Sequence, residues 1–207
     1  MKPPTTRLSA TNTVLTGVYF GALQWSAFFL LQSYLASTAI VYLLATAAWM
    51  VGSLAGLALP GKSRELAWLA ASIACFGLLH LLATTHPFEM NWLPALLLCL
   101  AGMGGYAGRF FRFRAMAGIT TDSDRLFLWE NTGFLGGMGL TLVLLCGIGD
   151  STLLLVPAVG AVLCGATLLG MPAVSEETFT PGTAVPGRPR IHVSRSAKPE
   201  SAPGGRL

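Results

Sequence analysis

Long apolar runs alternate with short polar segments through the first 171 residues of the chain. A helix needs about 20 mainly apolar residues to cross a bilayer. Six runs reach this length, and nearly all charged residues fall between them. The pattern predicts an all-α, polytopic bundle of six transmembrane helices, at residues 13–35, 38–59, 66–85, 92–110, 126–148 and 151–171.

The first two spans are separated by a short break, residues 33–38, that carries no charge. We expect a tight turn on the outer side there. Lys2 and Arg7 precede the first span as they would precede a secretory signal peptide. The apolar stretch 14–31 is longer than the 7–15 residues typical of such a signal, so we expect a retained helix.

The basic residues fix the predicted orientation. If the N-terminus is inside, the inner segments are 1–12, 60–65, 110–125 and 172–207. With Arg109 at a span edge, these segments hold all 13 Lys and Arg residues, whereas Glu89 and Asp150 are the only charges outside. Positive charge resists translocation. Both termini are therefore predicted to be cytoplasmic, in a bacterial inner membrane.

Composition supports this organisation. Hydrophobic residues make up 53% of the chain and charged residues 11%, where soluble domains carry about 25% charged residues. We divide the chain into a cytoplasmic N-terminus (1–12), a membrane domain (13–171) and a tail (172–207). The tail is rich in Pro, Gly, Ser and Thr and is predicted to be disordered. It either solubilises the protein or touches anionic lipid headgroups through its RPR and SRSAK sequences.

No cofactor or metal site is predicted. The four cysteines lie inside apolar runs without a CxxC pair, which indicates packing. Bis-histidine haem needs two histidines at one depth, but only His80 lies in a span, with His86 six residues later. The spans contain no lysine for a retinal Schiff base, and no nucleotide-binding or hydrolase motif occurs.

Four spans carry GxxxG pairs, which let helix backbones approach closely in lipid. In the predicted topology all four lie in the cytoplasmic halves of their helices. This depth predicts a bundle that is pinched on the cytoplasmic side and more open on the outer side. The pairs are Gly17/Gly21, Gly52/Gly56, Gly104/Gly108 and Gly133/Gly137.

Polar and aromatic residues continue the glycine faces at helical spacing. They are either polar groups satisfied between helices or the lining of a cavity. With His80 they form the candidate cavity lining: Gln24, Tyr42, Trp49, His80 and Thr141.

One acidic residue, Glu130, falls inside a predicted span and shares a face with Gly133 and Gly137. Arg112 follows Gly108 by four residues and extends the glycine face of the fourth span. We therefore predict a Glu130–Arg112 ion pair that clamps spans four and five. A proton or cation relay through Glu130 is the alternative, because carboxylates inside membranes are often functional.

Two stretches resemble the membrane domain fused to some bacterial spermidine synthases, itself reminiscent of half a major-facilitator transporter. They are STAIVYLLATAAWMVGSLAGLALPGKSRE and the run from DRLFLWENTGFLGG to the sixth span. In the second, Asn131 and Thr132 precede Gly133 and Gly137, as in that family. The aminopropyltransferase domain is absent, and Gln24–Trp25–Ser26 stands where the family often has an acidic residue. The resemblance therefore carries over no catalytic residue.

These observations lead to three functional hypotheses. The first is a non-enzymatic membrane module, an accessory or scaffold subunit of a larger inner-membrane assembly. The second is a small transporter or carrier of a lipophilic ligand that works as a dimer. The third, weaker hypothesis is a membrane redox or enzyme subunit that uses His80. The predicted partners are the lipid bilayer and other membrane subunits or a second copy, and not nucleic acid.

Overall fold

The computed structural model describes residues 4–35, 38–59, 65–116 and 123–170, and no β-strand occurs in these ranges. All six α-helices are long and apolar enough to cross a membrane. The predicted all-α, six-helix fold is confirmed, and the chain is a multi-pass membrane protein. The elements are α1 (Pro4–Tyr34), α2 (Ala39–Ala58), α3 (Glu65–Thr85), the 3-10 helix η1 (Met90–Trp92), α4 (Leu93–Met116), α5 (Ser123–Ile148) and α6 (Ser151–Leu169).

The helix ends follow the predicted spans, with two extensions. α1 begins at Pro4 rather than at residue 13, and α4 continues to Met116 rather than ending at residue 110. The predicted turn between the first two spans includes residues 36–37, which lie outside the described ranges. Thr38 caps α2, its Oγ1 accepting a hydrogen bond from the Val41 amide at 3.4 Å. The short turn between α5 and α6 passes through Gly149, whose φ of 93° suits glycine.

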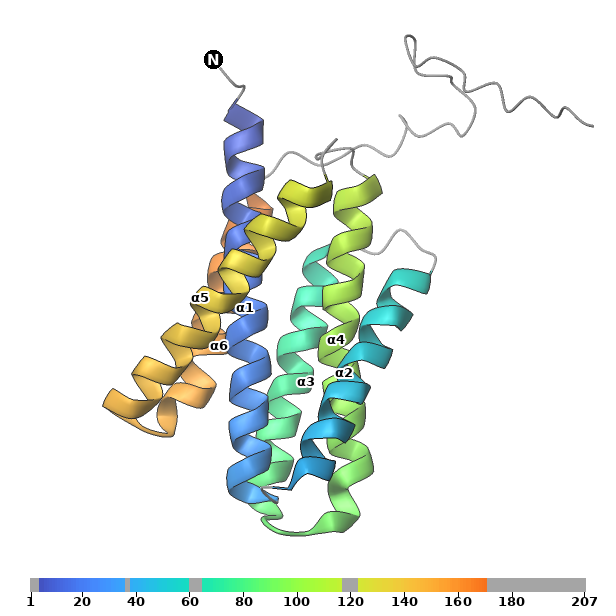
Figure 1. Ribbon diagram of the computed structural model, residues 1–207, viewed down its shortest axis with the longest axis vertical. Helices are drawn as coiled ribbons and strands as arrows, with labels where there is room; N and C mark the ends of the chain where they lie inside the picture. The colour runs from blue at the N-terminus through green and yellow to red at the C-terminus, as the bar shows by residue number, and fades with distance from the viewer. Residues whose placement is uncertain (1–3, 36–37, 60–64, 117–122, 171–207) are drawn as a thin grey trace, which may run out of the picture. The chain divides into compact units, whose positions relative to one another are not determined.

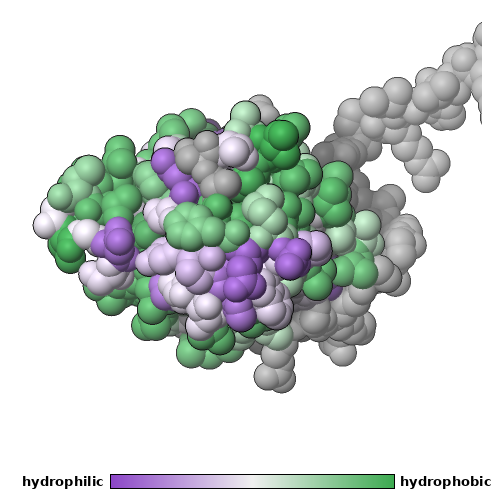
Figure 2. Space-filling model, turned by 90° about the horizontal axis from the view of Figure 1, so that it is seen from below, coloured by the Kyte–Doolittle hydropathy of each residue, from purple (hydrophilic) through white to green (hydrophobic). Residues whose placement is uncertain are grey.

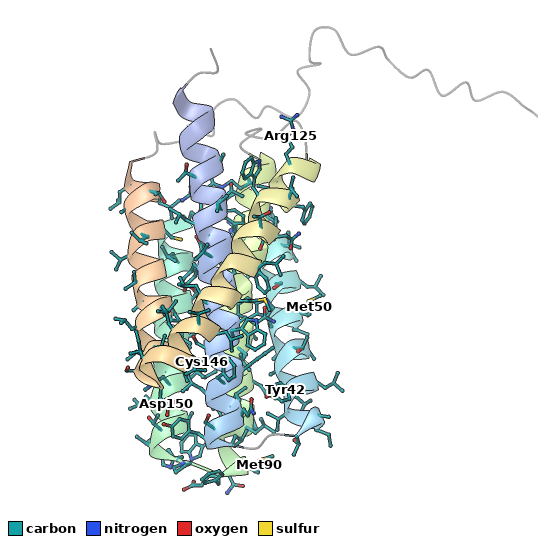
Figure 3. The ribbon with its side chains drawn as sticks, turned by 60° about the vertical axis from the view of Figure 1, so that its left-hand side comes forward. Tyr42, Met50, Met90, Arg125, Cys146 and Asp150 are labelled. Carbon is teal, nitrogen blue, oxygen red and sulfur yellow. The ribbon has the colours of Figure 1, made fainter. Side chains whose placement is uncertain are left out.

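The helices define two ends of the bundle. α1, α3 and α5 begin at one end, and α2, α4 and α6 begin at the other (Figure 1). We call the first the basic end, because α4 brings Arg109, Arg112 and Arg114 there and α5 begins there with Arg125. The opposite, far end carries the connection from α3 to α4. Figure 3 shows Arg125 and Met90 at these two ends.

The packing contains an internal repeat. α1 packs chiefly against α5, and α2 packs almost entirely against α4. The next largest contacts join α3 to α4 and α1 to α6, and α3 also touches α6. If the first three helices are matched to the last three, α1 corresponds to α4, α2 to α5 and α3 to α6. The α1–α5 contact then corresponds to the α4–α2 contact, and the α3–α4 contact corresponds to the α6–α1 contact. Because each half has an odd number of helices, the two halves run in opposite senses, as in inverted repeats.

Aromatic side chains fill the centre of this arrangement. Tyr19 and Phe20 of α1 are buried against Tyr106 and Phe110 of α4. The Phe20 ring lies 5.3 Å from Tyr106 and 5.9 Å from Phe110 between centroids, both edge to face. Phe76 of α3 is buried in the same cluster. The interior between α1, α3 and α4 is therefore packed with large rings.

The outer surface is apolar along the helices and polar at the far end. Large apolar side chains such as Met50 and Val162 are exposed on α2, α5 and α6. Seen from the far end, polar residues gather near the middle of the face with apolar surface around them (Figure 2). Such a distribution suits side walls that face lipid and an end that faces water.

Candidate functional site

The contact between α1 and α5 is built on glycine from both helices. A Cβ atom added at Gly17 or Gly21 would overlap a backbone carbonyl oxygen of α5. One added at Gly133 or Gly137 would overlap a carbonyl oxygen of α1. The two backbones therefore approach as closely as glycine allows, near the middle of both helices.

The contact between α2 and α4 repeats this design. A Cβ atom at Gly52 or Gly56 would overlap a backbone carbonyl oxygen of α4, and one at Gly104 or Gly108 would overlap one of α2. All eight glycines of the GxxxG pairs thus lie at helix contacts. Whether the bundle is pinched at the basic end stays a prediction.

Two arginines of α4 cap the end of α2. Arg109 is 1% exposed and its Nη1 donates to the carbonyl oxygen of Leu59 at 2.5 Å. Its guanidinium lies 4.8 Å from the Phe113 ring centroid. Arg112 donates to the carbonyl oxygens of Leu57 at 2.8 Å and Ala58 at 3.4 Å. The last carbonyls of a helix have no partner within it, so these cations satisfy them and complement the helix dipole.

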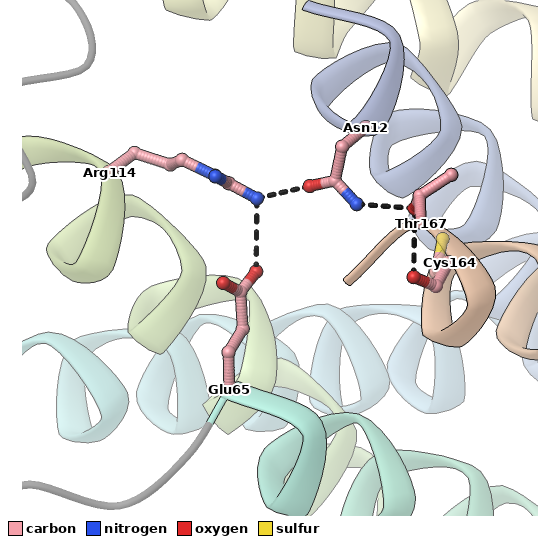
Figure 4. A network of polar contacts seen from close by, with 5 residues as sticks. All are labelled: Asn12, Glu65, Arg114, Cys164 and Thr167. Carbon is pink, nitrogen blue, oxygen red and sulfur yellow. Dashed lines mark hydrogen bonds and ion pairs between the residues drawn. The ribbon is translucent and has the colours of Figure 1, made fainter. Parts of the chain in front are cut away.

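A buried polar network joins four helices at the basic end (Figure 4). Arg114 of α4 donates to the side-chain oxygen of Asn12 of α1 and lies 3.4 Å from the Glu65 carboxylate of α3. The Asn12 amide donates to Thr167 Oγ1 of α6 at 2.6 Å, and Thr167 donates to the Cys164 carbonyl at 2.9 Å. Asn12 is fully buried and Arg114 is 3% exposed. The network therefore ties α1, α3, α4 and α6 together.

Sequence reasoning missed this network. It assigned Asn12 to the N-terminal segment, Arg114 to an inner loop that sets the orientation, and Glu65 to a loop before the third span. A usable signal was present: Glu65 is the only acidic residue beside the third span's inner end, and Arg114 stands at the inner end of the fourth. Thr167 offered no signal, because an isolated hydroxyl in an apolar run is common in membrane helices.

The structure does not bring Glu130 and Arg112 together. Arg112 binds carbonyls of α2, whereas Glu130 is 7% exposed on the face of α5 that packs against α1. Among the described residues, no hydrogen bond or ion pair joins the two. The predicted ion pair required α4 to pack on α5, but the principal partner of α4 is α2 and that of α5 is α1. The ion pair that α4 makes comes instead from Arg114.

The five candidate cavity residues lie in different surroundings. Trp49 is buried at the α2–α4 contact, and Thr141 donates to the Gly137 carbonyl of its own helix at 2.9 Å. Tyr42 donates to Gln32 Oε1 at 2.6 Å near the far end. Gln24 and His80 are half-buried on α1 and α3. Within the described ranges no hydrogen bond or ring contact joins any two of the five, so they do not form one polar site.

Three glycines of α5 lie away from every helix contact. A Cβ atom added at Gly136, Gly139 or Gly147 would meet nothing within 4 Å, and Thr132 is exposed on the same face. The spacing 132, 136, 139 and 147 places these residues along one side of the helix. We call them the outer stripe of α5. It differs from the Gly133/Gly137 face, which α1 covers.

The described residues show no arrangement typical of an enzyme or metal site. No group of three His, Cys, Asp or Glu residues in these ranges lies close enough to hold a metal ion. Cys75, Cys99, Cys146 and Cys164 are free thiols. No family model matches this chain, and no curated protein or solved structure is detectably similar to it.

Proposed function

We propose that this chain is a non-enzymatic membrane module, an accessory or scaffold subunit of a bacterial inner-membrane assembly. On this proposal the outer stripe of α5 binds a transmembrane helix of another subunit. The proposal agrees with the sequence resemblance to the membrane domain of the fused spermidine synthases.

The observation that carries the proposal is the contrast between two sets of glycines. All eight glycines of the GxxxG pairs are used, each against the backbone of another helix. Gly136, Gly139 and Gly147 lie along one side of α5 but have open space in front of them. Glycine in a helix interior costs about 1 kcal/mol relative to alanine. In lipid, small residues drive helix association by allowing close approach, so an uncovered stripe of them suits a partner helix.

The packed interior favours this function over catalysis. Tyr19, Phe20 and Tyr106 fill the space between the central helices and are at most 1% exposed. The two buried arginines of α4 bind the polar network and the end of α2. A subunit that binds through its outer surface needs no internal cavity.

The test is capture of membrane partners by the tagged chain in mild detergent, comparing three variants. Gly136→Leu and Gly139→Leu block the outer stripe without touching the bundle. Gly77→Leu is the matched control, because Gly77 of α3 also has nothing within 4 Å but lies outside the stripe. We expect a partner that is captured by the wild type and by Gly77→Leu and is lost from both stripe variants. Equal capture by all three variants would overturn the proposal.

A second candidate function is a small carrier that works as a dimer. The inverted arrangement of α1–α3 and α4–α6 favours it, because many secondary transporters are built from such repeats. This hypothesis predicts that two differently tagged copies of the chain purify together. If the only protein lost from the stripe variants is the second copy, the carrier hypothesis replaces the accessory subunit.

A further inference from the structure

Glu130 lies in the α1–α5 contact, inside the apolar span Arg125–Ile148. Its side chain is 7% exposed. Its own carbonyl oxygen faces Gly17 of α1, which places its backbone at one of the close contacts between the two helices. A buried carboxyl group therefore belongs to a residue on the face of α5 that packs closely against α1.

No cation compensates this carboxyl group among the described residues. From Ala10 to Tyr34, α1 contains no charged residue and no histidine, and α6 contains none from Ser151 to Leu169. On α5 the only base is Arg125, which is exposed and lies five residues before Glu130. No hydrogen bond or ion pair joins the Glu130 carboxyl to a described residue.

α4 meets α5 through the stacked rings of Phe111 and Phe127. The arginines of α4 nevertheless bind groups other than Glu130. Arg112 donates to carbonyls of α2, Arg109 donates to Leu59, and Arg114 binds Asn12 and Glu65. Glu65 itself is paired within this network. The charged groups near the basic end are thus committed to contacts that exclude Glu130.

An ionised carboxylate that is removed from water without a partner is far less stable than the neutral acid, which behaves as an ordinary polar group. We propose that Glu130 is a proton-binding site, which holds a proton while α1 and α5 are in contact and releases it when they separate. The site takes one proton per chain from water at the basic end. Proton release and helix separation are then linked, because each makes the other more favourable.

Infrared spectroscopy of the purified full-length chain in detergent tests the protonation directly, because a carboxylic acid and a carboxylate absorb at different frequencies. At neutral pH we expect a carboxylic acid band equivalent to one group per chain. The band is lost in Glu130→Gln and retained in Glu89→Gln, a control at an exposed acid of the far end. A wild type without this band at neutral pH, or a band that persists in Glu130→Gln, would overturn the proposal.

Thermal unfolding as a function of pH tests the link to helix contact. The contact holds the proton and the separated helices release it, so wild-type stability should fall as the pH rises above about 4.3, the pKa of a glutamate side chain in water. Glu130→Gln mimics the neutral acid and should show a smaller fall, whereas Glu89→Gln should follow the wild type. Parallel curves for all three proteins would refute the link. Partner capture by Glu130→Gln should be unchanged, so failure of the proton site is distinguishable from failure of the outer stripe.

Discussion

Replacing one glycine at a time on α5 tests how the bundle is held together. Gly133 and Gly136 lie three residues apart on the same helix, but only Gly133 faces a neighbour. An added Cβ at 133 would overlap the Val14 carbonyl oxygen and come within 3.0 Å of the Val14 carbonyl carbon and the Val18 amide nitrogen. All three are backbone atoms, so the overlap is relieved only if a whole helix shifts.

The two variants should therefore change the free energy of unfolding in opposite directions. At position 133, leucine overpacks the contact, which costs about 1–3 kcal/mol, and the rigid backbone places this variant near the upper limit. At position 136 the side chain enters open space, and the better helix propensity contributes up to about 1 kcal/mol. The difference between the variants should be about 2–4 kcal/mol by these two principles.

Reversible unfolding in mixed micelles, followed by circular dichroism, measures this difference. Gly52→Leu provides a second instance, because its Cβ would overlap the Ala101 carbonyl oxygen at the α2–α4 contact. Gly77→Leu on α3 is the second open control. If Gly133→Leu and Gly136→Leu unfold within about 0.5 kcal/mol of each other, the usual spread for surface substitutions, the close contacts do not hold the bundle.

Three further predictions concern the basic end, the orientation and the tail. Arg114→Gln should destabilise the bundle by about 3–5 kcal/mol in the same assay, because it leaves the Glu65 carboxylate without its cation; a change below 1 kcal/mol would make the network dispensable. Deletion of residues 175–207, which lie outside the described ranges, should leave the unfolding midpoint unchanged, whereas a lower midpoint would mean that the tail packs on the bundle. Reporter fusions should indicate cytoplasm at residues 61, 117 and 207 and the opposite side at 87 and 150, and an external signal at Ala117 would overturn the six-span topology.

The number and limits of the helices were predictable because lipid imposes one simple requirement, an apolar run of sufficient length. α2, predicted at 38–59, runs from Ala39 to Ala58, and α6, predicted at 151–171, runs from Ser151 to Leu169. The exceptions are the ends at Pro4 and Met116, where polar residues extend helices beyond the apolar runs.

Pairing between helices was harder to predict than their limits. GxxxG marks a face for close approach but does not specify its partner. Glu130 of α5 was therefore predicted to pair with Arg112 of α4, although its face packs on α1. The network of Asn12, Arg114 and Thr167 depends on three helix ends meeting at one level, which no local pattern encodes. Long-range pairing arises from shape complementarity along whole helices, and a single sequence does not display it.

The pairing of α1 with α5 also constrains how the protein is made. Helices enter the membrane in chain order, and α5 is synthesised only after the segment from residue 35 to residue 122. During this interval α2, α3 and α4 can assemble with one another, but the Gly17/Gly21 face of α1 lacks its principal partner. A chain that stops after α4 would leave this glycine face open to a helix of another membrane protein. Completion of α5 is therefore the step that commits the nascent chain to its own fold rather than to an intermolecular contact.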